Sequence, residues 1–256
     1  MYDEKLAFYY DMMYASKDYA QEAQFIKTTL ADCGHPQTLL DVGCGTGEHL
    51  RHLLKDDPDL EVVGVDLSLP MINVANTKEA LANQATFVHG RIQDISQSHF
   101  DHAMSMFNVV NHIPTLGELE GFFGAIRNKV QTGSLFIFDC WNGIAATRDT
   151  PRSDTRTKAV GHGTQIVIAY EPHIDLFNST VNMVNEVKVI SASGAILDEF
   201  NYELLHTLWA PKVLSDTLQK TAFAVRAVYK APYVEKRAAT ADDYKIVFVA
   251  EAVDYE

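Results

Sequence analysis

Residues Leu39-Leu40-Asp41-Val42-Gly43-Cys44-Gly45-Thr46-Gly47 decide the fold, because a short apolar run ends in glycines and is followed by the helical pattern of residues 48–54. The stretch predicts a buried strand, a tight turn and the N-terminus of a helix. The third glycine comes one residue earlier than in the G-x-G-x-x-G pattern of dinucleotide sites, and Asp41 precedes the turn. A carboxylate there repels a pyrophosphate, so the turn suits a ligand with a cationic or hydroxylated group.

The composition excludes several classes of function. The 256 residues are 47% hydrophobic, which is enough to bury a full core. A formal net charge of -13 argues against a nucleic-acid partner, since binding to a phosphate backbone depends on clustered Lys and Arg. Three cysteines without a C-x-x-C pair, a charged N-terminus and no long apolar window predict a cytoplasmic protein that does not bind membranes.

Strand and helix patterns alternate after residue 34. We expect strands near 39–42, 60–66, 85–89, 101–107 and 133–140, and helices near 46–55, 70–82 and 116–130. This alternation predicts an α/β fold with a parallel sheet covered on both faces. Ligands of such sheets bind beyond the carboxyl ends of the strands. The stretches expected to meet at that edge are 41–47, 66–68, 90–94 and 107–112.

The second half of the chain has a different pattern. Apolar and polar residues alternate along three long stretches, 165–174, 180–191 and 196–208. This alternation predicts an inserted antiparallel sheet of three strands. A helix near 212–220 and strands near 225–229 and 245–253 then complete the first sheet. We therefore expect lid helices at 1–33, a core at 34–144 and 209–256, and an insertion at 145–208. The tyrosines of the first helix either pack in a core or help to enclose a cationic ligand.

An acid follows the second strand at the place where a nucleotide site needs one. Asp66 lies nineteen positions after Gly47, where carboxylates that bind ribose hydroxyls are expected. Together with the glycine turn, Asp66 makes residues 34–140 resemble the class I S-adenosylmethionine-dependent methyltransferases. The resemblance implies S-adenosylmethionine as cofactor and a Rossmann-like, mostly parallel seven-stranded sheet. The residues implied to bind the cofactor are Tyr19, Asp41, Gly43, Gly45, His49, Asp66, Leu67, Met71, Ile92 and Met106.

A narrower resemblance extends over nearly the whole chain. Residues 7–11, 17–19, 47–50 and 106–112, with the inserted sheet, are similar to N-methyltransferases that act on amino groups of nucleotide-linked deoxysugars. In that family the inserted sheet builds the acceptor pocket or a dimer contact, and the product is an N-methyl or N,N-dimethyl sugar. Three positions depart from the family pattern, and all lie at binding positions. Arg91 replaces an acid that contacts adenine, with Asp94 nearby; Trp141-Asn142 replaces a tryptophan pair; and Lys245 stands for an arginine.

The residues expected around the methyl acceptor follow from what methyl transfer requires. An amine must be unprotonated and aligned behind the methyl carbon, so a nearby base or orienting group is expected. We interpret His112 and Tyr10 as catalytic, with packing or loop capping as the alternative for His112. Tyr14, Asn108, Trp141 and Lys245 are expected to bind the acceptor. If the acceptor carries a diphosphate, the nearest basic residues are Arg148, Arg152, Arg156, Lys158 and Lys245.

Two other functions stay open at this point. One is methylation of a hydroxyl or amine on another small metabolite, which shares the cofactor and differs in the acceptor. The other is an NAD-linked enzyme or a non-catalytic nucleotide-binding protein, which the glycine spacing opposes. No His, Cys or carboxylate spacing indicates a metal site.

Overall fold

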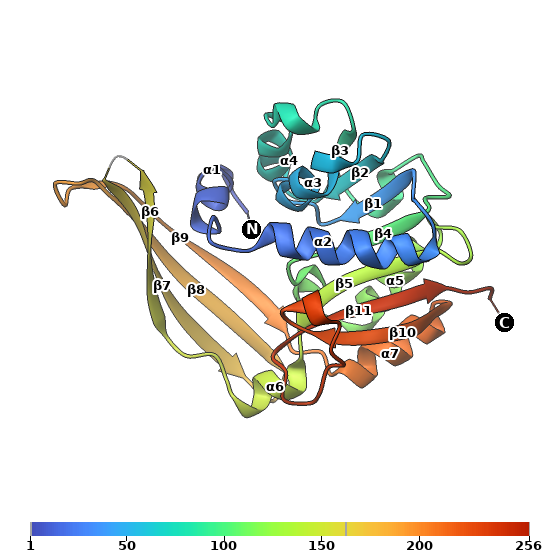
Figure 1. Cartoon of the computed structure of the whole chain (residues 1–256). Helices are drawn as coiled ribbons and strands as arrows, with labels where there is room; N and C mark the ends of the chain where they lie inside the picture. Colours follow the sequence, from blue (N-terminus) through green and yellow to red (C-terminus); the bar gives the residue numbers. More distant parts are fainter. Residues whose placement is uncertain (1, 162, 256) are drawn as a thin grey trace.

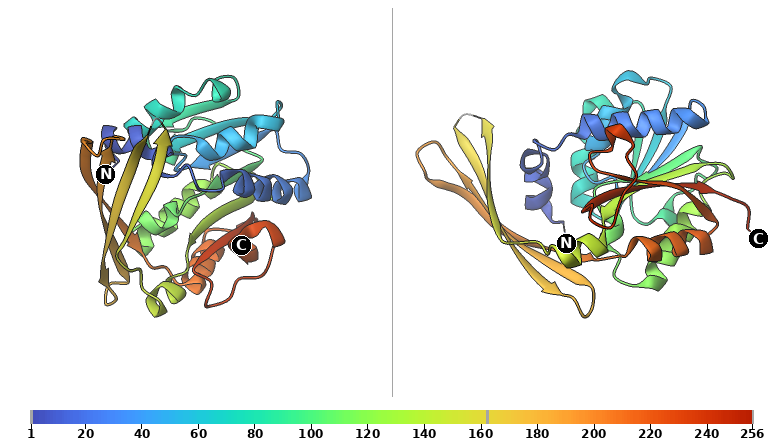
Figure 2. Two further views of the ribbon diagram at one scale, coloured as in Figure 1. Left: turned by 60° about the vertical axis from the view of Figure 1, so that its left-hand side comes forward. Right: turned by 60° about the horizontal axis from the view of Figure 1, so that its bottom comes forward.

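The computed structural model describes residues 2–161 and 163–255. A seven-stranded sheet lies between layers of helices, and a four-stranded sheet projects from one side of it (Figure 1). The two views in Figure 2 show the first helix, α1 (Glu4–Met13), in the space between the two sheets. The predicted α/β fold with a mostly parallel seven-stranded sheet is confirmed.

The large sheet has the strand order β10-β11-β5-β4-β1-β2-β3. Strands β1 to β5 are parallel, and β11 runs antiparallel to both β5 and β10. The order reverses at β1, so the turn after β1 lies where α/β sheets bind ligands. The bounds are β1 (Thr38–Val42), β2 (Glu61–Asp66), β3 (Ala85–His89), β4 (His102–Ser105), β5 (Leu135–Trp141), β10 (Phe223–Lys230) and β11 (Lys245–Ala252).

Helices cover both faces of this sheet because its central strands are apolar on both sides. On β5, Phe136 and Phe138 pack with α5 and α7, whereas Ile137 packs on the opposite face with α2 and α3. The same period of two directs Asp139 toward the α2 face. The further helices are α2 (Tyr19–Leu30), α3 (Glu48–Leu53), α4 (Leu69–Asn76), α5 (Leu116–Arg127), α6 (Gly143–Arg148) and α7 (Pro211–Lys220).

The inserted sheet has four strands, one more than the three that the sequence predicted. The strands are β6 (Asp154–Gly161), β7 (Thr164–Asp175), β8 (Thr180–Ile190) and β9 (Ile196–Thr207), all antiparallel. The missing strand was β6. It pairs only with β7, and most of its side chains are exposed. An edge strand of this kind lacks the alternation of apolar residues by which strands are recognised.

The aromatic α1 packs on the inserted sheet. Leu6 and Met13 are buried with Ile166, Ile168 and Tyr202 of that sheet. Thus α1 uses one side for core packing and directs other aromatic side chains into the space between the sheets. Core packing thus describes one side of this helix, and enclosure of a cationic ligand by its tyrosines stays a prediction.

Candidate functional site

The turn after β1 is held close to the end of β2. The N–H groups of Gly43 and Cys44 donate to the Val65 carbonyl oxygen at 2.8 and 3.1 Å. Gly43 has φ +75°, and a Cβ atom there would lie 2.6 Å from a methyl carbon of Val109. Only glycine fits this turn without strain.

Asp66 fixes the same turn from the other side. One carboxylate oxygen accepts the Gly45 N–H at 2.9 Å, and the other accepts the Ser68 N–H at 2.8 Å. Burial raises the pKa of Asp66, and these two hydrogen bonds oppose the rise. Free lone pairs remain on both oxygens and are available to hydroxyl donors.

Asp41 is a second carboxylate beside the turn, and it is only 3% exposed. Within the described residues it has neither a hydrogen-bond partner nor an ion-pair partner. Burial, with a smaller contribution from the charge of Asp66, raises the pKa of Asp41 to about 8. A buried carboxylate without a partner is costly, and a cationic ligand would relieve that cost.

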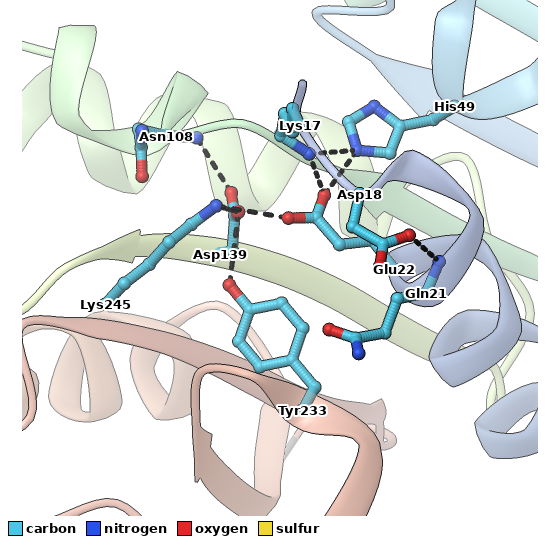
Figure 3. Close-up of polar contacts among 9 residues, drawn as sticks. All are labelled: Lys17, Asp18, Gln21, Glu22, His49, Asn108, Asp139, Tyr233 and Lys245. Carbon is cyan, nitrogen blue, oxygen red and sulfur yellow. Dashed lines mark hydrogen bonds and ion pairs between the residues drawn. The ribbon is translucent and has the colours of Figure 1, made fainter. Parts of the chain in front are cut away.

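A buried ionic cluster joins α2, α3, β5 and β11 next to this turn (Figure 3). Glu22 lies 2.7 Å from His49 and 3.4 Å from Lys245, and it also pairs with Lys17. Lys245 in turn lies 2.7 Å from Asp139, which is fully buried. Burial acts to raise the pKa of Glu22, but the His49 hydrogen bond and the two lysine charges outweigh it and hold the pKa well below its usual range.

The loop after β4 is strained next to this cluster. Phe107 and Asn108 have φ values of +70° and +64°, which non-glycine residues seldom adopt. The Asn108 N–H donates to Asp139 at 2.7 Å, so the cluster stabilises this conformation. Strain of this kind is concentrated at functional sites.

A cavity of about 550 Å³ opens between this loop, α1 and the inserted sheet. The core contributes the loop after β4 and the ends of β5 and β11, and the inserted sheet contributes β6 to β9. Its lining includes Tyr2, Tyr10, Tyr14, Phe107, Asn108, His112, Trp141, Arg152, Arg156, Tyr170, Asn185, Leu204, His206, Tyr244 and Lys245.

Two imidazoles and an indole form the wall of the cavity at the joint between the sheets. The rings of His112 and His206 are 4.7 Å apart, and His206 stacks on Trp141 at 4.5 Å with an interplanar angle of 4°. Asn111 holds the joint: its side-chain amide donates to the Thr207 carbonyl oxygen at 2.9 Å and accepts the Trp141 N–H at 2.9 Å. Asn111 is fully buried, so this attachment is protected from water.

The structure separates the predicted site residues into two groups. Six of them line the cavity: the predicted catalytic pair and the four predicted acceptor-binding residues. The residues expected to bind the cofactor lie instead around the glycine turn and the ionic cluster. His49 is bound within the cluster, and Tyr19 packs edge-on against His49. Met71, Ile92 and Met106 are buried, while Leu67 is 72% exposed beside Asp66 and free to be covered by a ligand.

The predicted basic residues do not all converge. Arg152 and Arg156 line the cavity, but each is paired with an aspartate, Asp149 and Asp154 respectively, at 2.8 Å. Arg148 pairs with Asp242, and Lys158 donates to the Ser16 hydroxyl. Asp94 accepts the Arg91 N–H at 2.7 Å and caps the short helical turn at residues 92–94.

The site residues that were not predicted include Glu22, Asp139 and His206. A signal existed for Asp139, because a charged residue in the apolar run of β5 must be paired to be buried. For Glu22 and His206 the sequence has no comparable signal, since their partners come from distant segments.

The glycine turn and the seven-stranded sheet define the fold of class I methyltransferases. Residues 39–133 match the family model described as "Methyltransferase domain". The predicted resemblance to the S-adenosylmethionine-dependent methyltransferases is thereby confirmed for this part of the chain.

Curated relatives and a solved structure agree with this class. The chain is 31% identical over 145 residues to the dTDP-3-amino-3,4,6-trideoxy-alpha-D-glucopyranose N,N-dimethyltransferase of Streptomyces venezuelae, covering 55% of this chain and 59% of the relative. It is 30% identical over 145 residues to the dTDP-3-amino-3,6-dideoxy-alpha-D-glucopyranose N,N-dimethyltransferase of Streptomyces fradiae, covering 55% and 54%. These alignments thus span little more than half of either relative. An S-adenosylmethionine-dependent methyltransferase from Clostridium acetobutylicum superposes with a TM-score of 0.81 at 18% identity, over 96% of this chain and 97% of that one.

The described residues contain neither a membrane-spanning helix nor a metal-binding cluster. No helix among them is long and apolar enough to cross a membrane. In the same residues, no three His, Cys, Asp or Glu side chains gather as a metal ion requires.

Proposed function

We propose that the chain transfers a methyl group from S-adenosylmethionine to an amine of a small molecule. The observation that supports this most is the pair of carboxylates, Asp41 and Asp66, on either side of the Gly43–Gly47 turn. Asp41 lacks a cationic partner in the described residues, and Asp66 offers free lone pairs. These groups fit a ligand that combines a cation with ribose hydroxyls.

The residues around the turn would hold the cofactor. Asp41 would face its cationic methionine part and Asp66 its ribose, while Leu67, Met71 and Ile92 would surround the adenine. When bound, S-adenosylmethionine supplies a methyl group on a sulfonium, which needs no nucleophilic side chain. The protein contributes alignment, for which effective molarities reach about 10⁵ M or more.

The acceptor would lie in the cavity between the sheets. Tyr2, Tyr10 and Tyr14 of the N-terminal segment line one side of it. A volume of about 550 Å³ accommodates a sugar-sized acceptor. We propose the amino group of a nucleotide-linked deoxysugar as acceptor, on the similarity to the two dimethyltransferases.

His112 is suited to take a proton from the acceptor. Its Nδ1 atom lies 3.0 Å from the Leu205 carbonyl oxygen, so Nδ1 carries the hydrogen and Nε2 has a free lone pair. Burial lowers the pKa of His112, which keeps the ring neutral at pH 7. His112 would accept a proton from the acceptor nitrogen at Nε2, which leaves that nitrogen with the lone pair it needs to take up the methyl group.

The test is a methyl-transfer screen with labelled S-adenosylmethionine. The panel contains nucleotide-linked amino sugars, their hydroxyl analogues and free amines. S-adenosylhomocysteine should raise the melting temperature, and NADH should not. Transfer to hydroxyl analogues alone would replace the N-methyl assignment with O-methylation, and stabilisation by NADH alone would exclude a methyltransferase.

A further inference from the structure

His206 is the group in the cavity wall to which neither the sequence nor the proposed mechanism gives a role. It is 5% exposed, comes from β9 of the inserted sheet, and lies beside His112. The period of two places His206 on the same face of β9 as Leu204, and both line the cavity. Its ring is fixed by the stacking on Trp141.

The hydrogen bonds of the two histidines define which atom each presents to the cavity. The Nδ1 atom of His206 lies 3.1 Å from the Leu204 carbonyl oxygen. In the same way, Nδ1 of His112 lies 3.0 Å from the Leu205 carbonyl oxygen. A carbonyl oxygen only accepts, so Nδ1 is the donor in both rings. In each neutral ring Nε2 is then a hydrogen-bond acceptor without a partner among the described residues.

The imidazole rings of His112 and His206 are both neutral at pH 7. Burial, followed by the charge of a protonated His112, lowers the pKa of His206 to about 3. This wall therefore offers acceptors and calls for a ligand with more than one donor group.

We propose that His206 is an acceptor-binding residue whose Nε2 atom receives a hydrogen bond from a hydroxyl group adjacent to the reacting amine. His112 follows β4 at the edge where the cofactor residues gather, so its Nε2 faces the amine itself. His206 belongs to the inserted sheet and reaches the neighbouring substituent. The new assignment is the role of His206, and this inference rests on the proposed function.

The first experiment tests the hydrogen-bond pattern without any ligand. Long-range ¹H–¹⁵N spectra of the ¹⁵N-histidine-labelled protein at pH 7 should show His206 and His112 as neutral rings with the hydrogen on Nδ1. His206→Asn and His112→Asn assign the two signals. A His206 ring with the hydrogen on Nε2 would overturn the proposal, since that atom would then donate.

The second experiment measures the coupling between His206 and one hydroxyl. Calorimetric titration uses three sugars: dTDP-3-amino-3,6-dideoxyglucose, its 4-deoxy analogue and its 2-deoxy analogue. For the natural protein, one deoxy analogue should bind about tenfold more weakly than the parent, because a buried acceptor loses its donor.

Two variants of His206 complete this cycle. His206→Asn keeps a donor near the Leu204 carbonyl and lacks the Nε2 acceptor, so it should bind the parent about tenfold more weakly and the same deoxy analogue unchanged. His206→Gln places an amide oxygen near the Nε2 position and should recover most of the affinity. An unchanged penalty for both deoxy sugars in His206→Asn would overturn the proposal, as would failure of all three sugars to bind the natural protein.

Failure of this inference and failure of the proposed function are distinguishable. The titrations need no cofactor, whereas the proposed function is tested by stabilisation with S-adenosylhomocysteine. His206→Asn should keep that stabilisation, which also shows that the variant folds. Loss of stabilisation in the natural protein would reject the cofactor while the sugar titrations still decide the role of His206.

Discussion

The side chains around the glycine turn and those in the cavity wall are held in place by different interactions. Around the turn, charged groups are held by main-chain N–H groups or by one another, as Asp66 is by Gly45 and Ser68. In the cavity wall, neutral rings are held by stacking and by main-chain carbonyl oxygens, as His206 is by Trp141 and Leu204. Under the proposed function, the turn would fix a charged ligand and the wall would select among neutral hydrogen-bond donors.

The two regions also differ in how much of the chain they need. The turn and its carboxylates come from β1, β2 and the residues just after them. The wall needs residues from both ends of the chain and from the insertion, brought together only by folding. Substitutions at the turn should therefore affect any acceptor equally, whereas substitutions in the wall should affect some acceptors more than others.

The largest effect is expected at Asp66. Asp66→Ala removes the charged acceptor of two main-chain N–H groups and the lone pairs proposed for the ribose. Each such bond is worth about 1.5–3 kcal/mol, so S-adenosylhomocysteine should bind about 100-fold more weakly or worse. Calorimetric titration measures this, with Glu61→Ala at the exposed start of the same strand as the control. Affinity within threefold of the natural protein would contradict the role of Asp66.

His112 should have the next largest effect, and on the chemical step. His112→Ala should lower kcat by about 10²-fold with saturating acceptor, since general acid–base help is of that size. His173→Ala is the matched control, because His173 is an exposed histidine on β7. A kcat within about threefold of the natural value would leave His112 with a packing role.

Gly143 tests the connection between the two regions. A Cβ atom at Gly143 would lie 2.3 Å from the Leu208 carbonyl oxygen, a main-chain atom that cannot move aside cheaply. Gly143→Ala should lower the free energy of unfolding by about 2 kcal/mol, measured by denaturant titration. Gly121→Ala, where a Cβ meets nothing within 4 Å in α5, should be neutral or slightly stabilising. Equal effects at both positions would argue against a close approach at this joint.

The smallest effect is a pH dependence at Asp41. Its folded pKa of about 8 means that a cationic ligand must displace a proton below that pH. The ionised fraction of Asp41 rises from about one tenth at pH 7 to about one half at pH 8, so the affinity for S-adenosylmethionine should rise about fivefold, and Asp41→Asn should remove this rise. The surface variant Asp59→Asn should keep it. A flat profile in the natural protein would show that Asp41 is not near the cation.

The pH dependence of the stability of the ligand-free protein tests the raised pKa of Asp41 independently. The pKa of Asp41 is higher in the folded protein than in the unfolded chain, so the protonated carboxyl favours folding and this contribution is lost as pH rises toward 8. Asp41→Asn should therefore gain stability relative to the natural protein between pH 6 and pH 8. Thermal unfolding at the two pH values measures the difference.

The sequence predicted the parts of this molecule that depend on local pattern. The glycine turn, the alternation of β1 to β5 with helices, and the position of Asp66 follow from spacing and period alone. β6 was missed because it is an exposed edge strand whose sequence does not alternate apolar and polar residues. His206 was missed because a period of two tells which side chains share a face and does not tell what that face meets.

The ionic cluster was beyond sequence reasoning for a similar reason. Lys245 was expected in the acceptor site, and it does line the cavity, but its charge is paired with Asp139 and Glu22. That pairing depends on the register of β11 against β5 and on how α2 lies over them. Neither is encoded within a short window of residues.

The contacts of Asn111 have a consequence for how acceptor specificity evolves. Among the described residues, the Asn111 side chain forms hydrogen bonds to main-chain atoms, namely the Thr207 carbonyl oxygen and the Trp141 N–H. It therefore attaches β9 to the core whatever side chains β9 has. Mutations on the cavity face of the insertion can therefore accumulate without loosening the attachment. An inserted sheet from a relative should be graftable at this joint as an exchangeable module, provided that an asparagine stays at position 111.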